Sequence, residues 1–267
     1  MRVDLRGGAG AVTLADNAGA RTFSNISTNF PTHQTMTTGG KLIAIEGIDG
    51  SGKRTQVELL KDALGARGYQ TFVTGFPIYD SWFGGMVGKF LDGGFGPLEK
   101  VDPHFTALLY AGDRFEAKEK IVEALAAGKI VLADRYIGSN MAHQTARVAA
   151  AERREFVKWI EHLEYQIYGL PRESAVIYLR VPPAEAQKLV AMKSARGYTA
   201  STHDLLEGNL RHLEDAAAMY DELAMRVNWI GVECFDARAQ AMRAPDVIAA
   251  EILAAVEAVM AAHGEKS

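Results

Sequence analysis

The sequence predicts a three-layer α/β fold, in which helices flank a central five-stranded parallel sheet. The prediction rests on short aliphatic runs that alternate with helical patterns, at 42–45, 71–73, 130–133, 176–179 and 229–232. Each run carries apolar side chains on both faces, as buried parallel strands do. The chain has 267 residues, 48% of them hydrophobic, which is enough for one large domain with a full core.

Helical periodicity fills the segments between these runs. One predicted helix places four apolar residues on a single face, at Phe156, Ile160, Leu163 and Ile167. That face suits either the core or a partner chain. A second helix is predicted from Leu206 to Ala224. Local signals predict helix starts at Asp102-Pro103 and Pro182-Pro183, and helix ends near Gly68 and Gly128.

Residues 1–40 differ in composition from the remainder of the chain. They are rich in Gly, Thr, Ser and Asn and carry few large apolar side chains. Such a segment buries too little surface to offset the entropy of ordering it. We therefore expect a disordered extension at 1–40 and a folded domain at 41–267. Met36 lies just before the first predicted strand, so we also consider that translation starts there. The intact mass of the natively expressed protein tests this hypothesis.

Charge and composition narrow the possible partners. The formal net charge of −4 argues against a nucleic-acid duplex, which usually meets a basic face. No run approaches the roughly 18–20 apolar residues that cross a bilayer, so no membrane partner is expected. Cys234 is the single cysteine, which rules out an intrachain disulfide and favours a reducing, cytoplasmic location.

The segment Gly47–Lys53 fits the phosphate-loop pattern G-x-x-x-x-G-K, between the first strand and a helical stretch. Glycines let successive backbone N–H groups face phosphate oxygens, and the start of the following helix favours negative charge. The lysine adds a point charge. We therefore expect nucleotide phosphates to be bound by Gly47, Ile48, Asp49, Gly50, Ser51, Gly52, Lys53, Arg54 and Thr55.

One position of the loop departs from the pattern. Arg54 stands where a Ser or Thr usually offers its hydroxyl to Mg²⁺. Thr55 is rotated by about 100° around the helix and does not replace it. The metal then depends on phosphates, water and carboxylates, with Asp49, Asp134 and Glu207 as candidate ligands.

Further polar blocks follow the predicted strands, where α/β sheets bind ligands. Residues 76–79 follow the second strand, and 134–144 follow the third. Two other polar sites, at 113–114 and 204–207, have simpler structural interpretations. Asp113-Arg114 suits a surface ion pair, and Glu207 suits a helical pair with Arg211.

Together these blocks resemble the thymidylate kinase family. The matching stretches are IEGIDGSGKRTQ, FPIYD, YAGDRFE, LADRYIGSNMAHQ and the DLLE at 204–207, in the family's order and spacing. The resemblance runs from about Lys41 to the last helix. It implies a P-loop NTPase fold with a small lid at about 192–204. It also implies a homodimer that uses ATP and Mg²⁺ to phosphorylate dTMP for DNA precursor synthesis.

The resemblance further implies roles for individual residues. Phosphoryl transfer would depend on Lys53, Arg135, Asp49, Asp134 and Arg196. The acceptor nucleotide would be bound by Phe76, Tyr79, Arg114, Arg135, Asn140, His143 and Gln144. Phe76 would pack on thymine, Arg114 and Asn140 would bond its edge, and Tyr79 and Arg135 would meet its phosphate. Asp49 would touch the 3′-hydroxyl or a metal-bound water, and His143 would lie where a ribose 2′-hydroxyl would be.

Two departures from the family pattern keep alternatives open. Ile78 stands where an arginine is usual, and the lid segment at 198–203 is less basic than in the branch of the family that the chain resembles. Family members carry the extra cation either in the loop or in the lid, and Gly50 leaves this loop without an arginine, so Lys193 and Arg196 in the lid are the expected cations. Besides a dTMP kinase, the sequence therefore allows a kinase for another pyrimidine monophosphate, such as dUMP or dCMP. It also allows a nucleotide-binding protein with little catalysis.

Overall fold

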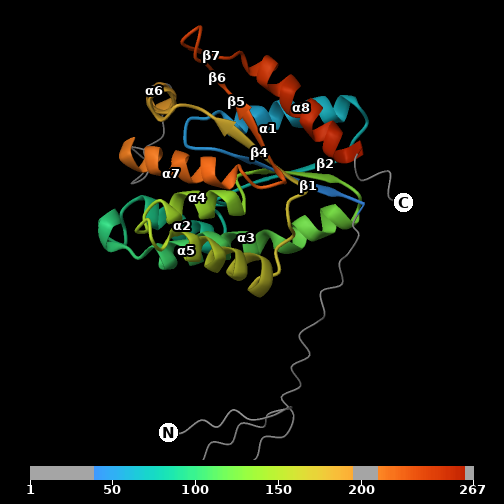
Figure 1. Cartoon of the computed structure of the whole chain (residues 1–267). Helices are drawn as coiled ribbons and strands as arrows, with labels where there is room; N and C mark the ends of the chain where they lie inside the picture. Colours follow the sequence, from blue (N-terminus) through green and yellow to red (C-terminus); the bar gives the residue numbers. More distant parts are fainter. Residues whose placement is uncertain (1–38, 195–209, 262–267) are drawn as a thin grey trace, which may run out of the picture. The chain divides into compact units, whose positions relative to one another are not determined.

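The fold comes from a computed structural model, which describes residues 39–194 and 210–261 (Figure 1). A five-stranded parallel sheet lies at its centre, in the order β2-β3-β1-β4-β5. Its strands are β1 Lys41–Glu46, β2 Thr71–Gly75, β3 Ile130–Asp134, β4 Ala175–Arg180 and β5 Trp229–Glu233. Each predicted aliphatic run lies within one of them, so the predicted fold class is confirmed.

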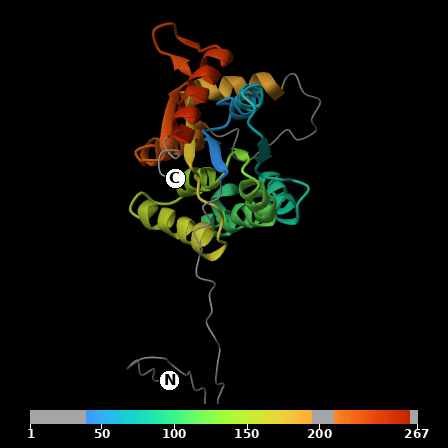
Figure 2. The same cartoon turned by 90° about the vertical axis from the view of Figure 1, so that its right-hand side faces the viewer.

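Helices cover both faces of this sheet (Figures 1 and 2). One face carries α1 Lys53–Ala66 and α8 Pro245–Ala261. The other carries α3 Pro103–Ala126 and α4 Ile137–Thr145, against which α5 Arg153–Glu161 and α7 Leu210–Leu223 pack. The remaining elements are α2 Trp82–Leu91, η1 Leu98–Lys100, η2 His162–Ile167, α6 Pro183–Ser194 and the hairpin of β6 Phe235–Asp236 and β7 Ala241–Met242.

The middle strands form the core because helices bury them from both sides. All residues of β1 from Leu42 to Glu46 are buried. The expectation of a buried strand is wrong for β2, which is only partly buried, with Val73 37% exposed. The reason is its position, since β2 is at the edge of the sheet and has a neighbour on one side only.

The predicted helix boundaries are confirmed where the structure describes them. Asp102 caps α3, accepting hydrogen bonds from the backbone N–H groups of His104 at 2.7 Å and Phe105 at 3.3 Å. Pro183 is the first residue of α6. Gly68 and Gly128 have φ angles of 82° and 75° just beyond α1 and α3. This left-handed conformation suits glycine after a helix end.

The apolar face predicted through Phe156, Ile160, Leu163 and Ile167 is wrong at its end. Phe156 and Ile160 are buried in the core, which excludes them as a surface for a partner chain. Ile167, however, is 64% exposed, and Glu164 is buried instead. The helix changes to a π turn in η2, His162–Ile167. Wider π turns break the 3.6-residue period, so an α-helical pattern no longer tells which side faces inward.

Cys234, directly after β5, is a free and buried thiol. Burial raises the pKa of its side chain to about 12.

Two predicted segments lie largely outside the described residues. These are the extension at 1–40, of which only the last two residues are described, and the lid at 192–204, of which only the first three are. The hypothesis of a start at Met36 falls in the first of them. In the part of the chain that is described, no helix is long and apolar enough to span a membrane.

Candidate active site

A cavity of about 720 Å³ opens beside the phosphate loop, at the carboxyl ends of β2 and β3. Its volume is in the range of small-molecule sites. Most predicted site residues line it: Asp49, Gly50, Gly52, Lys53, Arg54, Phe76, Tyr79, Arg114, Asp134, Arg135, Asn140, His143 and Gln144. The structure therefore brings the predicted phosphate loop and the predicted acceptor residues into one pocket. Gly47, Ile48, Ser51 and Thr55 belong to the loop or to α1 but do not line it.

The loop connects β1 to α1 in a conformation that suits an anion. Gly52, the residue before α1, has φ 87° and caps the helix with no side-chain hydrogen bond. The first turn of α1 also lacks an acidic residue. Neither a side-chain cap nor a first-turn carboxylate neutralises the start of α1, which favours a bound phosphate there. Gly50 is required sterically, because a Cβ there would lie 2.2 Å from the backbone oxygen of Ala186.

Lys53 folds back into this loop. Its Nζ donates hydrogen bonds to the backbone oxygens of Gly47 at 2.9 Å and Ile48 at 2.8 Å. Burial lowers the pKa of Lys53 to about 8, and the charge of Arg135 acts in the same direction. The ammonium group is therefore held by weak neutral acceptors, which phosphate oxygens can replace.

Arg135 joins the end of β3 to the loop. Its Nη2 forms an ion pair with Asp49, and its Nη1 donates to the hydroxyl of Ser139 at 3.2 Å. Burial alone would raise the pKa of Asp49, but the charges of Arg135 and Lys53 outweigh burial and hold that pKa below its usual value. Arg135 has φ 68°, a left-handed conformation that is uncommon outside glycine. Strain of this kind is concentrated at functional sites.

Glu46, which the sequence analysis did not identify, holds the segment that follows Arg135. Its carboxylate is fully buried and accepts hydrogen bonds from the backbone N–H groups of Tyr136 at 2.7 Å and Ser139 at 3.0 Å. The hydroxyls of Ser139 and Tyr220 also donate to it, at 2.6 and 2.9 Å. A carboxylate at the start of α4 complements the helix dipole. The signal in the sequence was an acidic residue at the end of a buried strand.

A second buried carboxylate, Glu164, binds two of the predicted acceptor residues. It accepts hydrogen bonds from Arg114 Nε at 2.5 Å, Arg114 Nη2 at 2.7 Å and Asn140 Nδ2 at 2.7 Å. We call Arg114, Asn140 and Glu164 the Glu164 cluster. The Arg114 guanidinium lies 5.9 Å from the ring centre of Phe76, which is itself 5% exposed. The cluster therefore combines a flat apolar surface with polar groups of fixed orientation.

The simpler interpretation of Asp113-Arg114 as a surface ion pair is wrong, because both side chains are buried. Asp113 instead accepts hydrogen bonds from the backbone N–H of Ile78 at 3.0 Å and from the Ser81 hydroxyl at 2.8 Å. It thereby fixes the segment that carries Phe76. The side chain of Ile78 packs against the core and does not line the pocket.

His143 pairs with a residue that the sequence did not indicate, His212 on α7. His143 Nε2 lies 3.5 Å from Arg135 Nη1, and His143 Nδ1 lies 3.3 Å from His212 Nε2. Burial lowers the pKa of both rings, that of His212 to about 4, so both are neutral at pH 7. Because Arg135 can only donate, His143 Nε2 is the acceptor and its proton lies on Nδ1.

Asp49 and Asp134 are the two predicted metal ligands that line the pocket. No group of three or more His, Cys, Asp or Glu side chains that could hold a metal occurs within 39–194 and 210–261. Mg²⁺ often takes only one or two carboxylates and completes its coordination with phosphates and water. The residues present fit such an ion when it arrives with a nucleotide. Arg196 and Glu207 lie outside the described residues, as does the side chain of Lys193.

Comparisons with known proteins show which family the chain resembles. A family model described as thymidylate kinase matches residues 45–234. The thymidylate kinase of Mycobacterium tuberculosis is 31% identical over 191 residues, which cover 71% of this chain and 88% of that protein. A probable thymidylate kinase of Pyrococcus abyssi is 33% identical over 63% of this chain and 77% of its own.

Among solved structures, the thymidylate kinase of Candida albicans superposes with a TM-score of 0.61. The match covers 82% of this chain and 92% of the other, at 18% sequence identity. Since that identity is low, the superposition supports the fold alone.

Proposed function

The chain belongs to the thymidylate kinase family and transfers the γ-phosphate of ATP to dTMP, and we propose that the pocket described above is where this transfer takes place. One observation carries the proposal: the phosphate loop and two members of the Glu164 cluster, Arg114 and Asn140, line the same cavity. Phosphoryl transfer needs two anionic nucleotides in line and little covalent chemistry. A loop for the donor phosphates beside a cluster for a base meets that need.

On the donor side, we assign the ATP phosphates to the loop Gly47–Lys53. Phosphate oxygens would replace the backbone oxygens of Gly47 and Ile48 as acceptors for Lys53 Nζ, which already lies inside the loop. A charge-assisted bond is roughly twice as strong as a bond to a neutral carbonyl, so the exchange favours binding. Arg54 adds a second cation at the start of α1, where it lines the pocket.

On the acceptor side, Phe76 packs against the base while Arg114 and Asn140 bond its edge. Tyr79, at the pocket rim, and Arg135 meet the acceptor phosphate. The planar guanidinium of Arg135 suits phosphate oxygens and spreads the charge that develops during transfer. The acceptor phosphate already carries an anionic oxygen, so it attacks without a general base. His143 stands beside Arg135, where it would exclude a ribose 2′-hydroxyl.

We assign Mg²⁺ to the same pocket, bound mainly through ATP. Asp134 and Asp49 are the carboxylates that line it. Of these, Asp49 is paired with Arg135, which makes Asp134 the better ligand. The metal would neutralise charge on the transferring phosphate.

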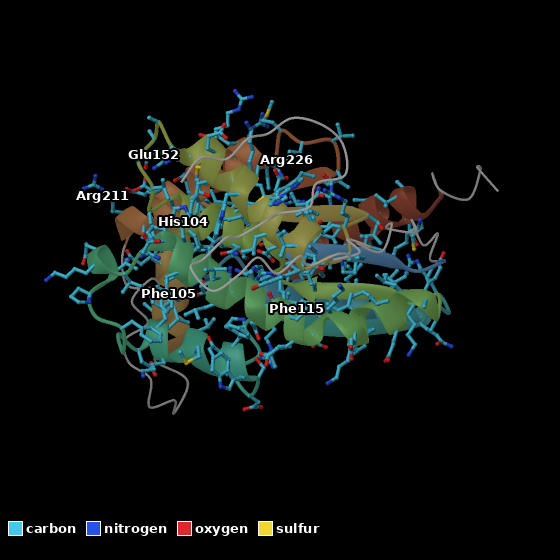
Figure 3. All side chains as sticks on the ribbon, turned by 90° about the horizontal axis from the view of Figure 1, so that it is seen from below. His104, Phe105, Phe115, Glu152, Arg211 and Arg226 are labelled. Carbon is cyan, nitrogen blue, oxygen red and sulfur yellow. The ribbon has the colours of Figure 1, made fainter. Side chains whose placement is uncertain are left out.

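We also propose that the protein is a homodimer that pairs through α3. Phe105, Leu108 and Phe115 are 39%, 37% and 47% exposed. Phe105 and Phe115 are labelled along α3 on the side seen in Figure 3. An exposed apolar stripe on one helix suits a two-fold interface, in which the same surface of each copy meets the other. Light scattering after Phe115→Glu tests this, and a dimer of unchanged stability would contradict it.

The cytoplasmic location stays a prediction.

An ADP-release assay with dTMP, dUMP and dCMP as acceptors tests the proposed reaction. We expect turnover with dTMP that is lost in Lys53→Ala. Calorimetric binding of ATP without turnover on any acceptor would contradict the assignment.

A second candidate function, nucleotide binding with little catalysis, is favoured by one observation. Ile78 supplies no cation to the pocket and packs against the core. If that missing charge limits the protein, Ile78→Arg should raise turnover clearly. The kinase assignment predicts no rise, because Arg135 and Arg54 already line the pocket.

A further inference from the structure

The carboxylate of Glu164 does not line the pocket, yet it controls two residues that do. Its side chain is completely buried on η2, the π turn that follows α5. It holds Arg114 through two hydrogen bonds and Asn140 through one. The three residues come from α3, α4 and η2, so the cluster forms only when these elements are packed together.

These contacts fix which way the Asn140 amide faces. Its Nδ2 donates one hydrogen to Glu164 at 2.7 Å and the other to the backbone oxygen of Ala107 at 3.1 Å. Turning the amide over would set Oδ1 against a carboxylate oxygen and a carbonyl oxygen. Two such contacts between acceptors are strongly unfavourable in the protein interior. Glu164 therefore keeps Oδ1 directed away from itself.

Asn140 Oδ1 is left as an unused acceptor. It exposes less than 1 Å², and no donor within the described residues reaches it. Buried acceptors without a donor are rare in folded proteins and need an explanation. A ligand N–H that enters the pocket and reaches Oδ1 would supply the missing donor.

Glu164 also fixes the Arg114 guanidinium, which presents a donor where Asn140 presents an acceptor. Glu164 takes the hydrogens of Nε and one of Nη2. Within 39–194 and 210–261, no acceptor is found for the hydrogens of Nη1. The cluster thus offers a donor from Arg114 and an acceptor from Asn140. A uracil-type ring presents a carbonyl oxygen beside an N–H and matches this pair, whereas cytosine presents an amino group beside a bare ring nitrogen.

We propose that Glu164 is a specificity-determining positioning residue, which sets the hydrogen-bond polarity of the base site. It makes the site accept thymine and uracil and reject cytosine. This role depends on the proposed function, which places the acceptor base in the pocket. It adds the residue that enforces the choice among pyrimidines.

The test compares Glu164→Gln with the parent chain on dTMP, dUMP and dCMP, by ADP release and by calorimetric binding. Glutamine offers a donor as well as an acceptor, so of the two contacts that oppose turning the Asn140 amide over, only the one with the Ala107 oxygen remains. We expect the ratio of kcat/KM for dTMP to that for dCMP to fall by roughly 10- to 100-fold, as when one hydrogen bond to the base is reversed. The values for dUMP should follow those for dTMP, and KM for ATP should not change.

Glu173→Gln is the matched control. It removes another buried carboxylate by the same chemical change, and Glu173 bonds Tyr165 rather than Arg114 or Asn140. The control should keep the dTMP to dCMP ratio of the parent chain. A fall in that ratio in the control as large as in Glu164→Gln would overturn the proposal, since any buried carboxylate would then serve.

A folded Glu164→Gln protein with an unchanged ratio would also overturn it. If that variant does not fold, Glu164→Asp keeps the charge for Arg114 while withdrawing the carboxylate by one methylene. We then expect a smaller fall in the ratio, and an unchanged ratio counts against the proposal. Base-selective binding that is lost in the variant, without turnover on any acceptor, would support Glu164 while removing the kinase function.

Discussion

The phosphate loop and the Glu164 cluster both contribute residues to one pocket but are built in opposite ways. The loop is seven consecutive residues, Gly47–Lys53, whose backbone N–H groups are the proposed phosphate ligands. The cluster joins side chains that are 50 positions apart in the chain, as with Arg114 and Glu164. The loop can therefore change its function without loss of the fold, whereas the cluster is part of the core. Substitutions in the loop should therefore change binding without changing stability, whereas substitutions in the cluster should change both.

The largest expected effect is on stability, at the cluster. Glu164→Gln leaves the Arg114 guanidinium buried and without its charged partner, which typically costs about 3–5 kcal/mol. Urea unfolding measures the loss. Glu155→Gln, which breaks an exposed pair with Lys158, is the comparison and should leave the unfolding midpoint nearly unchanged. Equal losses for the two variants would show that the cluster is not part of the stabilising core.

The next effect is on activity, at the loop. Lys53→Ala removes the cation that we assign to the donor phosphates, and we expect kcat to fall by about 10²–10³-fold. The unfolding midpoint should stay close to that of the parent chain, because Lys53 bonds only carbonyls and a hydroxyl of the loop. Lys61→Ala, on the exposed side of α1, should leave kcat unchanged. Near-normal turnover in Lys53→Ala would refute the loop assignment.

A third effect concerns Glu173, a buried carboxyl outside the pocket. Burial raises its pKa to about 7 from an ordinary 4.5. The folded chain then holds a proton that the unfolded chain has released, so stability falls as the pH rises from 4.5 to 7. At about 1.4 kcal/mol for each pKa unit, the loss reaches about 3 kcal/mol.

Glu173→Gln removes this titration. The variant should be more stable than the parent chain at pH 8 and about equal to it at pH 4.5. Thermal melts of both proteins across this range give the difference. A constant difference would mean that Glu173 titrates normally.

The smallest effect is the pH dependence of ATP binding through Lys53. With a pKa of about 8, the free ammonium loses its proton above that pH and no longer attracts phosphate. We expect kcat/KM for ATP to fall about fivefold between pH 8 and pH 9, as for a single titrating group. The same profile in Lys61→Ala is the control, and a flat profile up to pH 9.5 would contradict the lowered pKa.

The local features of the fold could be predicted from the sequence. The five strands, the caps of α3 and the phosphate loop all follow from adjacent residues or regular spacing. Glu164 did not, because its burial depends on the π turn that ends the α-helical period after Glu161. His212 did not either, since only packing of α7 against α4 brings it to His143. Residues joined by tertiary contact leave no periodic signal in a single sequence.

The buried thiol of Cys234 provides a chemical probe of local opening. It is the chain's single cysteine, and its raised pKa keeps it protonated and slow to alkylate while β5 is in place. A thiol reagent can therefore react only when that edge of the sheet opens. The labelling rate then reports how often this edge opens, with and without nucleotide. A cysteine introduced at any exposed position would also be the only fast-reacting label on the folded protein.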